Sequence, residues 1–265
     1  MTAPRLFVLT ASASAGAVIL RRGPSKMTAA LYWDRESDVI EMGQWVKARI
    51  YEHRSDLSPD GRHMIYFANK GGGVGGYTVI SRAPWFRALY FSPQGHTWHG
   101  GGAFSENGSV FLNGATPETA LPDGLAPTEI DAFPHSTDGF HMGDLFAAIM
   151  LRRGWHRSAA GGYALILTRV LENGVALELS VVQGRKDRGL ISCAFALVGG
   201  DGQRYDMPDW TWADRWGDGL HFARAGALWF GRTTEGCELV DTRLIRDFGD
   251  MTYREIRAPY EGIRE

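Results

Sequence analysis

A short turn-forming cluster that ends in glycine and leads directly into an apolar run recurs five times along the 265-residue chain. The copies are "SASAGAVIL", "SPDGRHMIYF", "SENGSVFL", "SAAGGYALIL" and "ARAGALWFG", with marker glycines at positions 16, 61, 108, 161 and 226. Successive markers are 45, 47, 53 and 65 residues apart, at or beyond the ~40–50-residue period of propeller blades. Because one small twisted sheet cannot bury both of its faces alone, such a repeat predicts several sheets stacked together.

The composition also favours many strands joined by tight turns. The chain holds 34 glycines and nine tryptophans, and 12% of its residues are aromatic. Glycine supplies turns, and aromatic side chains fill pleated surfaces. The run "YALILTR", the turn Glu172-Asn173-Gly174 and the alternating run "VALELSVVQ" form a hairpin pattern. We therefore predict an all-β fold, either a five-bladed β-propeller or a propeller-like stack of small antiparallel sheets, with an irregular β-sandwich or barrel as the alternative.

The repeats divide a single β-repeat domain, residues 1–265, into approximate units. These units are 1–45, 46–92, 93–115, 150–190 and 191–248. Residues 116–142 interrupt them as a proline-rich insertion loop, and 143–153 have the apolar spacing of a short helix. We expect residues 249–265 to form either a closing strand of the first unit or a polar tail.

One copy carries a family resemblance. The stretch "DLSPDGRHMIYFA" is similar to the strand–turn–strand signature of TolB-type and WD40-like β-propeller repeats, and Tyr32-Trp33-Asp34 resembles a blade end. The close match covers one unit of five, since only this copy has the full Ser-Pro-Asp-Gly tetrapeptide and residues 115–155 break the rhythm. The resemblance implies an architecture and no activity.

The segments that enter the recurring turns hold the candidate binding residues. The resemblance implies that such a strand is often the innermost of a blade and lines a central channel. The segments "ARIYEHRSD", "QGHTWHGGGAF", "LRRGWHRSA" and "DMPDWTWADRWGDG" concentrate basic and aromatic residues. From them we predict a cationic, aromatic-walled site for an anionic or polyhydroxylated ligand. Its candidate residues are Arg49, His53, Arg54, His96, Trp98, His99, Arg153, Trp155, His156 and Trp210. Packing between blades is the competing interpretation of the same residues.

Catalytic and metal-binding signals are weak by comparison. Carboxylates beside aromatic residues in "YDMPDWTWADRWGDG" resemble the acids of glycosidases, and Asp206 and Asp209 are the candidate catalytic residues. His96 and His99 could share a metal only if the chain bends at Gly95 or Gly100. We predict no metal and no cofactor. "KGGGVGGY" lacks the Gly-Lys-Ser/Thr ending of a phosphate loop.

Two hypotheses for the function follow. The first is a soluble binding module that recognises a small anionic molecule or a protein partner at one face of the channel. The alternative is a channel-centred hydrolase of a glycosidic or ester bond. A net charge of −2 gives no global attraction to nucleic acid or membranes, so we expect neither as a partner. Two cysteines make no disulfide framework, and no apolar run approaches the ~20 residues of a membrane span. These features predict a cytoplasmic protein.

Overall fold

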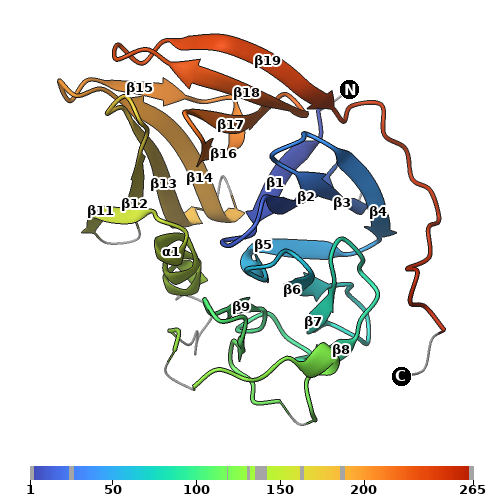
Figure 1. Cartoon of the computed structure of the whole chain (residues 1–265). Helices are drawn as coiled ribbons and strands as arrows, with labels where there is room; N and C mark the ends of the chain where they lie inside the picture. The colour runs from blue at the N-terminus through green and yellow to red at the C-terminus, as the bar shows by residue number, and fades with distance from the viewer. Residues whose placement is uncertain are drawn as a thin grey trace. The chain divides into compact units, whose positions relative to one another are not determined.

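The structure is a computed structural model of the chain, shown in Figure 1. It describes residues 3–23, 27–117, 119–129, 132–134, 142–161, 164–185 and 189–262. The chain divides into two compact units. Unit 1 contains Met1–Phe7 and Met150–Met251, and unit 2 contains Val8–Ile149 and Thr252–Glu265.

Two four-stranded sheets and one two-stranded pair precede the helix. The first sheet has the order β1-β2-β3-β4, with β1 (Arg5–Thr10), β2 (Gly16–Arg22), β3 (Thr28–Asp34) and β4 (Ile40–Val46). The second sheet has the order β5-β6-β7-β8, with β5 (Arg49–Leu57), β6 (His63–Asn69), β7 (Gly76–Arg82) and β8 (Tyr90–Pro93). The pair is β9 (Gly102–Phe104) with β10 (Val110–Leu112). Within each sheet the strands follow chain order, so each is a simple meander like a propeller blade.

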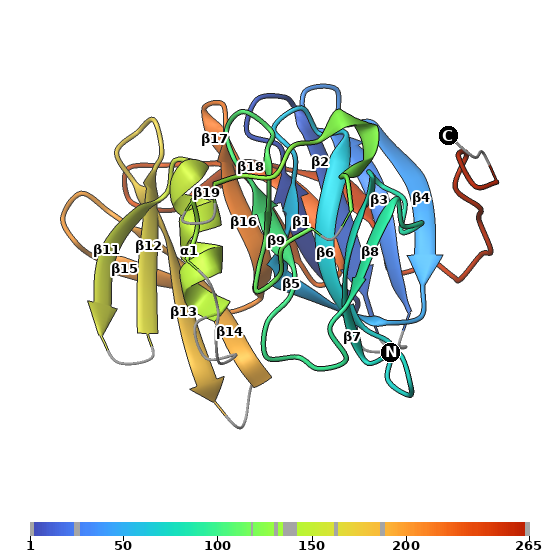
Figure 2. The ribbon, with the colours of Figure 1, turned by 90° about the horizontal axis from the view of Figure 1, so that it is seen from below.

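Two further meanders form unit 1. The first contains β11 (His156–Gly161), β12 (Ala164–Val170), β13 (Ala176–Arg185), β14 (Gly189–Val198) and β15 (Arg204–Met207). The second contains β16 (Trp210–Trp216), β17 (Gly219–Arg224), β18 (Ala227–Thr233) and β19 (Leu239–Asp247). The antiparallel strands β13 and β14 have ten residues each, and Figure 2 shows them as two long neighbouring strands.

The predicted all-β architecture and its propeller-like sheets are confirmed, but the prediction of five blades is wrong. Over the described residues, four sheets reach four or five strands. The stretch predicted as a third unit, 93–115, gives only β9 and β10, of three residues each. The later sheets span 156–207 and 210–247, so residues 191–207 pair with the preceding strands. The predicted helix is confirmed as α1 (Met142–Arg152).

Three of the recurring turns join the first and second strands of their sheets. Their glycines are Gly16, Gly61 and Gly108. In the Ser-Pro-Asp-Gly turn, the Ser58 hydroxyl donates to Asp60 (2.6 Å) and accepts from the His63 backbone N–H (2.9 Å). Gly61 has φ +80°, which favours glycine. The turn after Gly161 lies outside the described residues, and Gly226 joins β17 to β18, the second and third strands of its sheet.

The Ser-Pro-Asp-Gly turn also connects two neighbouring sheets of unit 2. The backbone N–H of Ala13, in the β1–β2 turn, donates to the Pro59 carbonyl (3.0 Å). A Cβ on Gly61 would meet the Ser14 hydroxyl at 3.3 Å. The turn therefore has a structural role, because it sets the contact between two sheets.

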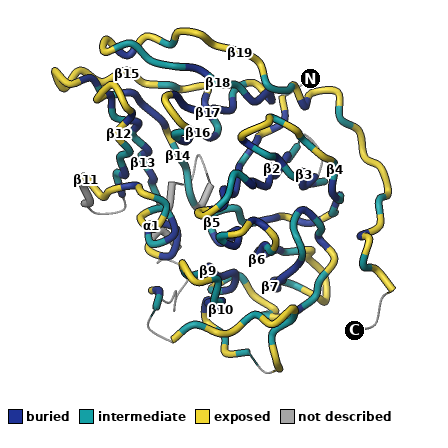
Figure 3. The backbone as a smooth tube through the Cα atoms, viewed as in Figure 1, coloured by how far each residue is buried: buried dark blue, intermediate teal, exposed yellow. Residues whose placement is uncertain are grey.

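The described part of the proline-rich insertion packs against the second sheet. Leu121 and Leu125 lie on an apolar cluster, which contains Ile65, Ile80, Tyr90, Phe104, Val110 and Leu112. Val110 donates to the Ala126 carbonyl (2.8 Å), and its own carbonyl accepts from Thr128 (2.9 Å). A second cluster joins Phe111 and Phe133 to the Leu145 and Ile149 side chains of α1. Figure 3 shows the buried stretches of β6, β7 and β9 that these clusters cover.

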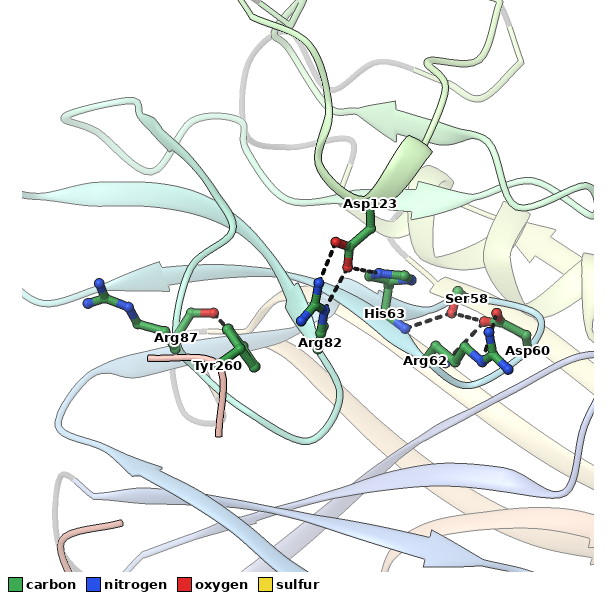
Figure 4. A network of polar contacts seen from close by, with 8 residues as sticks. All are labelled: Ser58, Asp60, Arg62, His63, Arg82, Arg87, Asp123 and Tyr260. Carbon is green, nitrogen blue, oxygen red and sulfur yellow. Dashed lines mark hydrogen bonds and ion pairs between the residues drawn. The ribbon is translucent and has the colours of Figure 1, made fainter. Parts of the chain in front are cut away.

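A polar network holds the insertion onto the strand ends of the same sheet (Figure 4). Asp123, in the 3₁₀ turn η1 (Pro122–Gly124), accepts from Arg82 Nε at 2.8 Å and Nη2 at 2.6 Å, and contacts His63 Nε2 at 2.8 Å. Hydrogen bonds from Arg82, and then from His63, lower the pKa of Asp123 from 3.8 to about 2. The Arg82 guanidinium lies 5.2 Å from the ring centre of Tyr260, whose hydroxyl donates to the Arg87 carbonyl.

Replacing Asp123 by asparagine is expected to lower the free energy of unfolding at pH 7 by about 1–2 kcal/mol. Asparagine tolerates the φ of +55° at this position, so the change removes mainly the charge. Since the folded pKa is depressed, the stabilisation is complete above pH ~5 and is lost as the pH falls through the 3.8-to-2 interval. Urea unfolding at pH 6 and pH 3 measures this: the gap between wild type and Asp123→Asn should narrow at pH 3. An equal gap at both values would contradict it.

The C-terminal segment forms no strand over residues 252–262, so the expected closing strand is absent from this described stretch. It contacts β4 of the same unit through side chains instead. Gln44 of β4 donates to the Ile256 carbonyl (3.1 Å), and the rings of Trp45 and Tyr253 pack edge to face at 6.2 Å. Among the described residues no helix is long and apolar enough to cross a membrane.

Candidate binding surface

The most constrained feature among the predicted site residues is the loop of residues 94–101, "QGHTWHGG", which follows β8. Arg54 of β5 reaches into it: its Nη1 donates to the His99 carbonyl and its Nη2 to the Thr97 carbonyl, both at 2.9 Å. Arg54 is 1% exposed, and its guanidinium lies 5.0 Å from the ring centre of Phe67 and 5.5 Å from that of Tyr51. Burial lowers the pKa of Arg54 to about 10, so it stays charged at neutral pH.

A bulge in β5 positions Arg54. Tyr51 pairs with Phe67, and Asp56 pairs with Ile65, so five steps along β5 match two along β6. The extra residues break the alternation of a regular strand and turn the next polar side chains inward. Asp56 is consequently buried, and its carboxylate accepts from the backbone N–H groups of Leu57 (2.9 Å) and Phe104 (2.8 Å).

Glycines and one asparagine fix the other side of the loop. A Cβ on Gly76 would clash with the His96 carbonyl, and a Cβ on Gly100 would clash with the Phe67 ring. The Asn113 side chain donates to the Gly100 carbonyl (3.1 Å), and the backbone groups of Gly101 and Asn113 pair at 2.9 Å. The loop is therefore anchored to β5, β7 and the turn after β10.

Two histidines and a tryptophan occupy the outer part of this loop. The rings of His96 and His99 meet edge to face, with centres 4.6 Å apart. Gly95 and Gly100 have φ of +73° and +106°, so the bend that brings the rings together is present. Trp98 is 56% exposed, and its backbone N–H donates to His96 Nδ1 at 3.4 Å.

The imidazole of His99 is neutral at neutral pH. Burial is the main cause that lowers its pKa below 6.5, and the neighbouring His96 and Arg54 add to the effect. Its Nδ1 is buried and has no hydrogen-bond partner in the part of the chain described. A positively charged neighbourhood of this kind disfavours a metal cation and favours an anion.

Arg49 and His53 lie on β5, the strand that also carries Arg54. The guanidinium of exposed Arg49 lies 4.8 Å from the ring centre of Tyr51, the same ring that Arg54 contacts. The half-buried His53 packs edge to face on Phe146 of α1 at 4.8 Å. The carboxylate on this strand segment, Glu52, pairs with Arg22 at 3.0 Å.

Unit 1 holds the remaining predicted ligand-binding residues. Trp155 is buried, Arg153 is half-buried in the turn after α1, and His156 is exposed on β11. Trp210 is buried and stacks on Phe222 with ring centres 4.6 Å apart. The convergence of these residues with those of unit 2 stays a prediction.

The candidate catalytic acids also belong to unit 1. Asp206 is exposed at the end of β15 and pairs with Arg204 at 2.8 Å. Asp209 is exposed in the two-residue connection to β16. A hydrolase requires two acids facing one cleft. Glu178 of β13 pairs with the same Arg204 as Asp206 does, so this arginine lies between the two carboxylates as their shared partner.

In unit 2, described contacts join Arg54 to the loop that carries His96, Trp98 and His99, whereas the grouping of Arg49 with that loop stays a prediction. The described contacts also add Tyr51, Phe67 and Asn113, which had not been singled out. A strand segment with an unbroken run of polar residues, 52–56, is the signal that could have revealed the bulge.

Searches of protein-family models, curated proteins and solved structures gave no match for this chain. Within the described ranges no group of three or more His, Cys, Asp or Glu side chains could hold a metal ion.

Proposed function

We propose that the chain is a binding module that recognises a small anionic molecule on the surface formed by Arg49, His96, Trp98 and His99, hereafter the Trp98 surface. The observation that carries the proposal is the anchoring of loop 94–101 by the buried Arg54. Because a buried arginine donates hydrogen bonds to two carbonyls of the loop, the loop conformation is fixed before binding. A ligand that binds a fixed loop causes a smaller loss of conformational entropy.

The charges of this surface support an anion as the ligand. Arg49 is a cation, and His96 is an exposed imidazole. Since His96 Nδ1 accepts the Trp98 backbone N–H, the ring N–H is on Nε2, which can donate to a ligand. The negative charge of Glu52 is paired with Arg22, so it does not repel an anion bound at this surface.

The experiment is a thermal-shift screen of the full chain with inorganic phosphate, citrate and nucleoside phosphates, followed by calorimetric titration of any hit. A ligand at 100 times its Kd should stabilise the protein by about 2.7 kcal/mol. Arg49→Gln and His96→Gln should each weaken binding about three- to tenfold, because each removes one exposed donor.

Arg62→Gln is the matched control, because Arg62 is an exposed arginine of unit 2 on the Ser-Pro-Asp-Gly turn, with a side chain 82% exposed. It should leave the affinity unchanged. The proposal fails if no anion binds the wild type, which would favour a protein partner, or if Arg62→Gln weakens binding as much as Arg49→Gln does.

A further inference from the structure

Trp98 is the large apolar side chain of the Trp98 surface, and it is exposed to solvent. It is 56% exposed, although the carbonyls on both sides of it, those of Thr97 and His99, accept from the buried Arg54. The exposure of the indole is thus a property of an anchored loop. Exposed aromatic rings that are held in place serve as stacking platforms for planar rings.

Two histidines flank Trp98 in the same loop. His96 precedes Trp98 by two residues, and the neutral His99 follows it and touches the His96 ring. An imidazole carries an N–H group, so the exposed His96 ring can donate a hydrogen bond to an anionic group. An anion without a ring could hydrogen-bond to the imidazoles but would make no stacking contact with the indole. A neutral ring could stack on the indole but would accept no charge-assisted hydrogen bond from the imidazoles.

We propose that the ligand of the Trp98 surface is an anion that carries a planar ring, with the ring stacked on Trp98 and the anionic group held by the His96–His99 pair. This inference rests on the proposed function and specifies its ligand class. Nucleoside monophosphates and aryl phosphates have this chemistry.

The test compares matched ligands by calorimetric titration at pH 6.5. Phenyl phosphate and adenosine 5′-monophosphate carry both groups, inorganic phosphate has only the anionic group, and adenosine has only the ring. The two ring-bearing anions should bind at least about tenfold more tightly than phosphate or adenosine. Trp98→Ala should remove most of that advantage, and Trp98→Phe should retain part of it.

Phe91→Ala is the control variant, because Phe91 is a comparably exposed aromatic residue (48%) of β8, and its ring packs against that of Tyr77 at a tilt of 35°. It should leave the preference unchanged. Equal binding of phosphate and phenyl phosphate, with no effect of Trp98→Ala, would overturn the ring inference and leave the anion-binding function intact. Failure of phosphate, citrate and both ring-bearing anions to bind would overturn both.

Discussion

Replacing Arg54 by methionine is expected to lower the free energy of unfolding by about 2–4 kcal/mol, because two acceptors lose a charged donor. Methionine keeps much of the apolar stem but cannot donate to the Thr97 and His99 carbonyls, which accept from the guanidinium at 2.9 Å. It also removes the cation that lies 5.5 Å from the ring centre of Tyr51 and 5.0 Å from that of Phe67. Denaturant unfolding followed by circular dichroism measures the change, and amide hydrogen exchange should show loop 94–101 opening.

Arg49→Met is the matched comparison, since Arg49 is an exposed arginine of the same strand that contacts the same Tyr51 ring. Its effect on the free energy of unfolding should stay within about 0.5 kcal/mol. Equal stabilities for the two variants would contradict the anchoring role of Arg54.

Replacing Gly76 by alanine is expected to destabilise the protein by about 2–4 kcal/mol, through overpacking against a backbone that cannot yield. The new Cβ would clash with the His96 carbonyl and the Phe67 ring. Since the clash displaces the loop, the variant should also bind anions more weakly. Thermal unfolding, together with calorimetric titration of any anion that binds the wild type, measures both effects.

Gly73→Ala in the same glycine-rich stretch is the control. A Cβ there meets nothing within 4 Å. The change should be neutral or slightly stabilising, by up to ~1 kcal/mol, because alanine restricts the unfolded chain. A loss of stability in Gly73→Ala as large as in Gly76→Ala would show that the stretch tolerates no side chain, and the argument from packing against His96 would fall.

The sequence patterns predicted the elements better than their assembly. The strand runs, the turns at Gly16 and Gly61 and the helix near 143–153 follow from local residue preferences, and all are present. The count of five blades failed because the turn at Gly108 resembles the others locally, although its strands have only three residues. The turn at Gly226 does not mark the first turn of a blade, as the repeat had suggested. It joins the second and third strands of a sheet whose first turn is at Gly217.

The candidate site shows the same limit. Residue types singled out Arg54, His96 and Trp98, but charge alone suggested that Arg54 faces a ligand, whereas its described contacts are the loop carbonyls and two rings. Regular alternation would place Arg54 on the opposite face from Tyr51. The bulge reverses this, and its register is set by long-range pairing with β6.

The most direct test of a binding site at the Trp98 surface is an amide chemical-shift titration of the isotopically labelled full chain with adenosine 5′-monophosphate. We expect the perturbed amides to cluster in residues 49–54 and 94–101, with the largest changes next to Trp98. Perturbations concentrated around Asp206 and Asp209, or spread evenly without saturation, would contradict a binding site at the Trp98 surface.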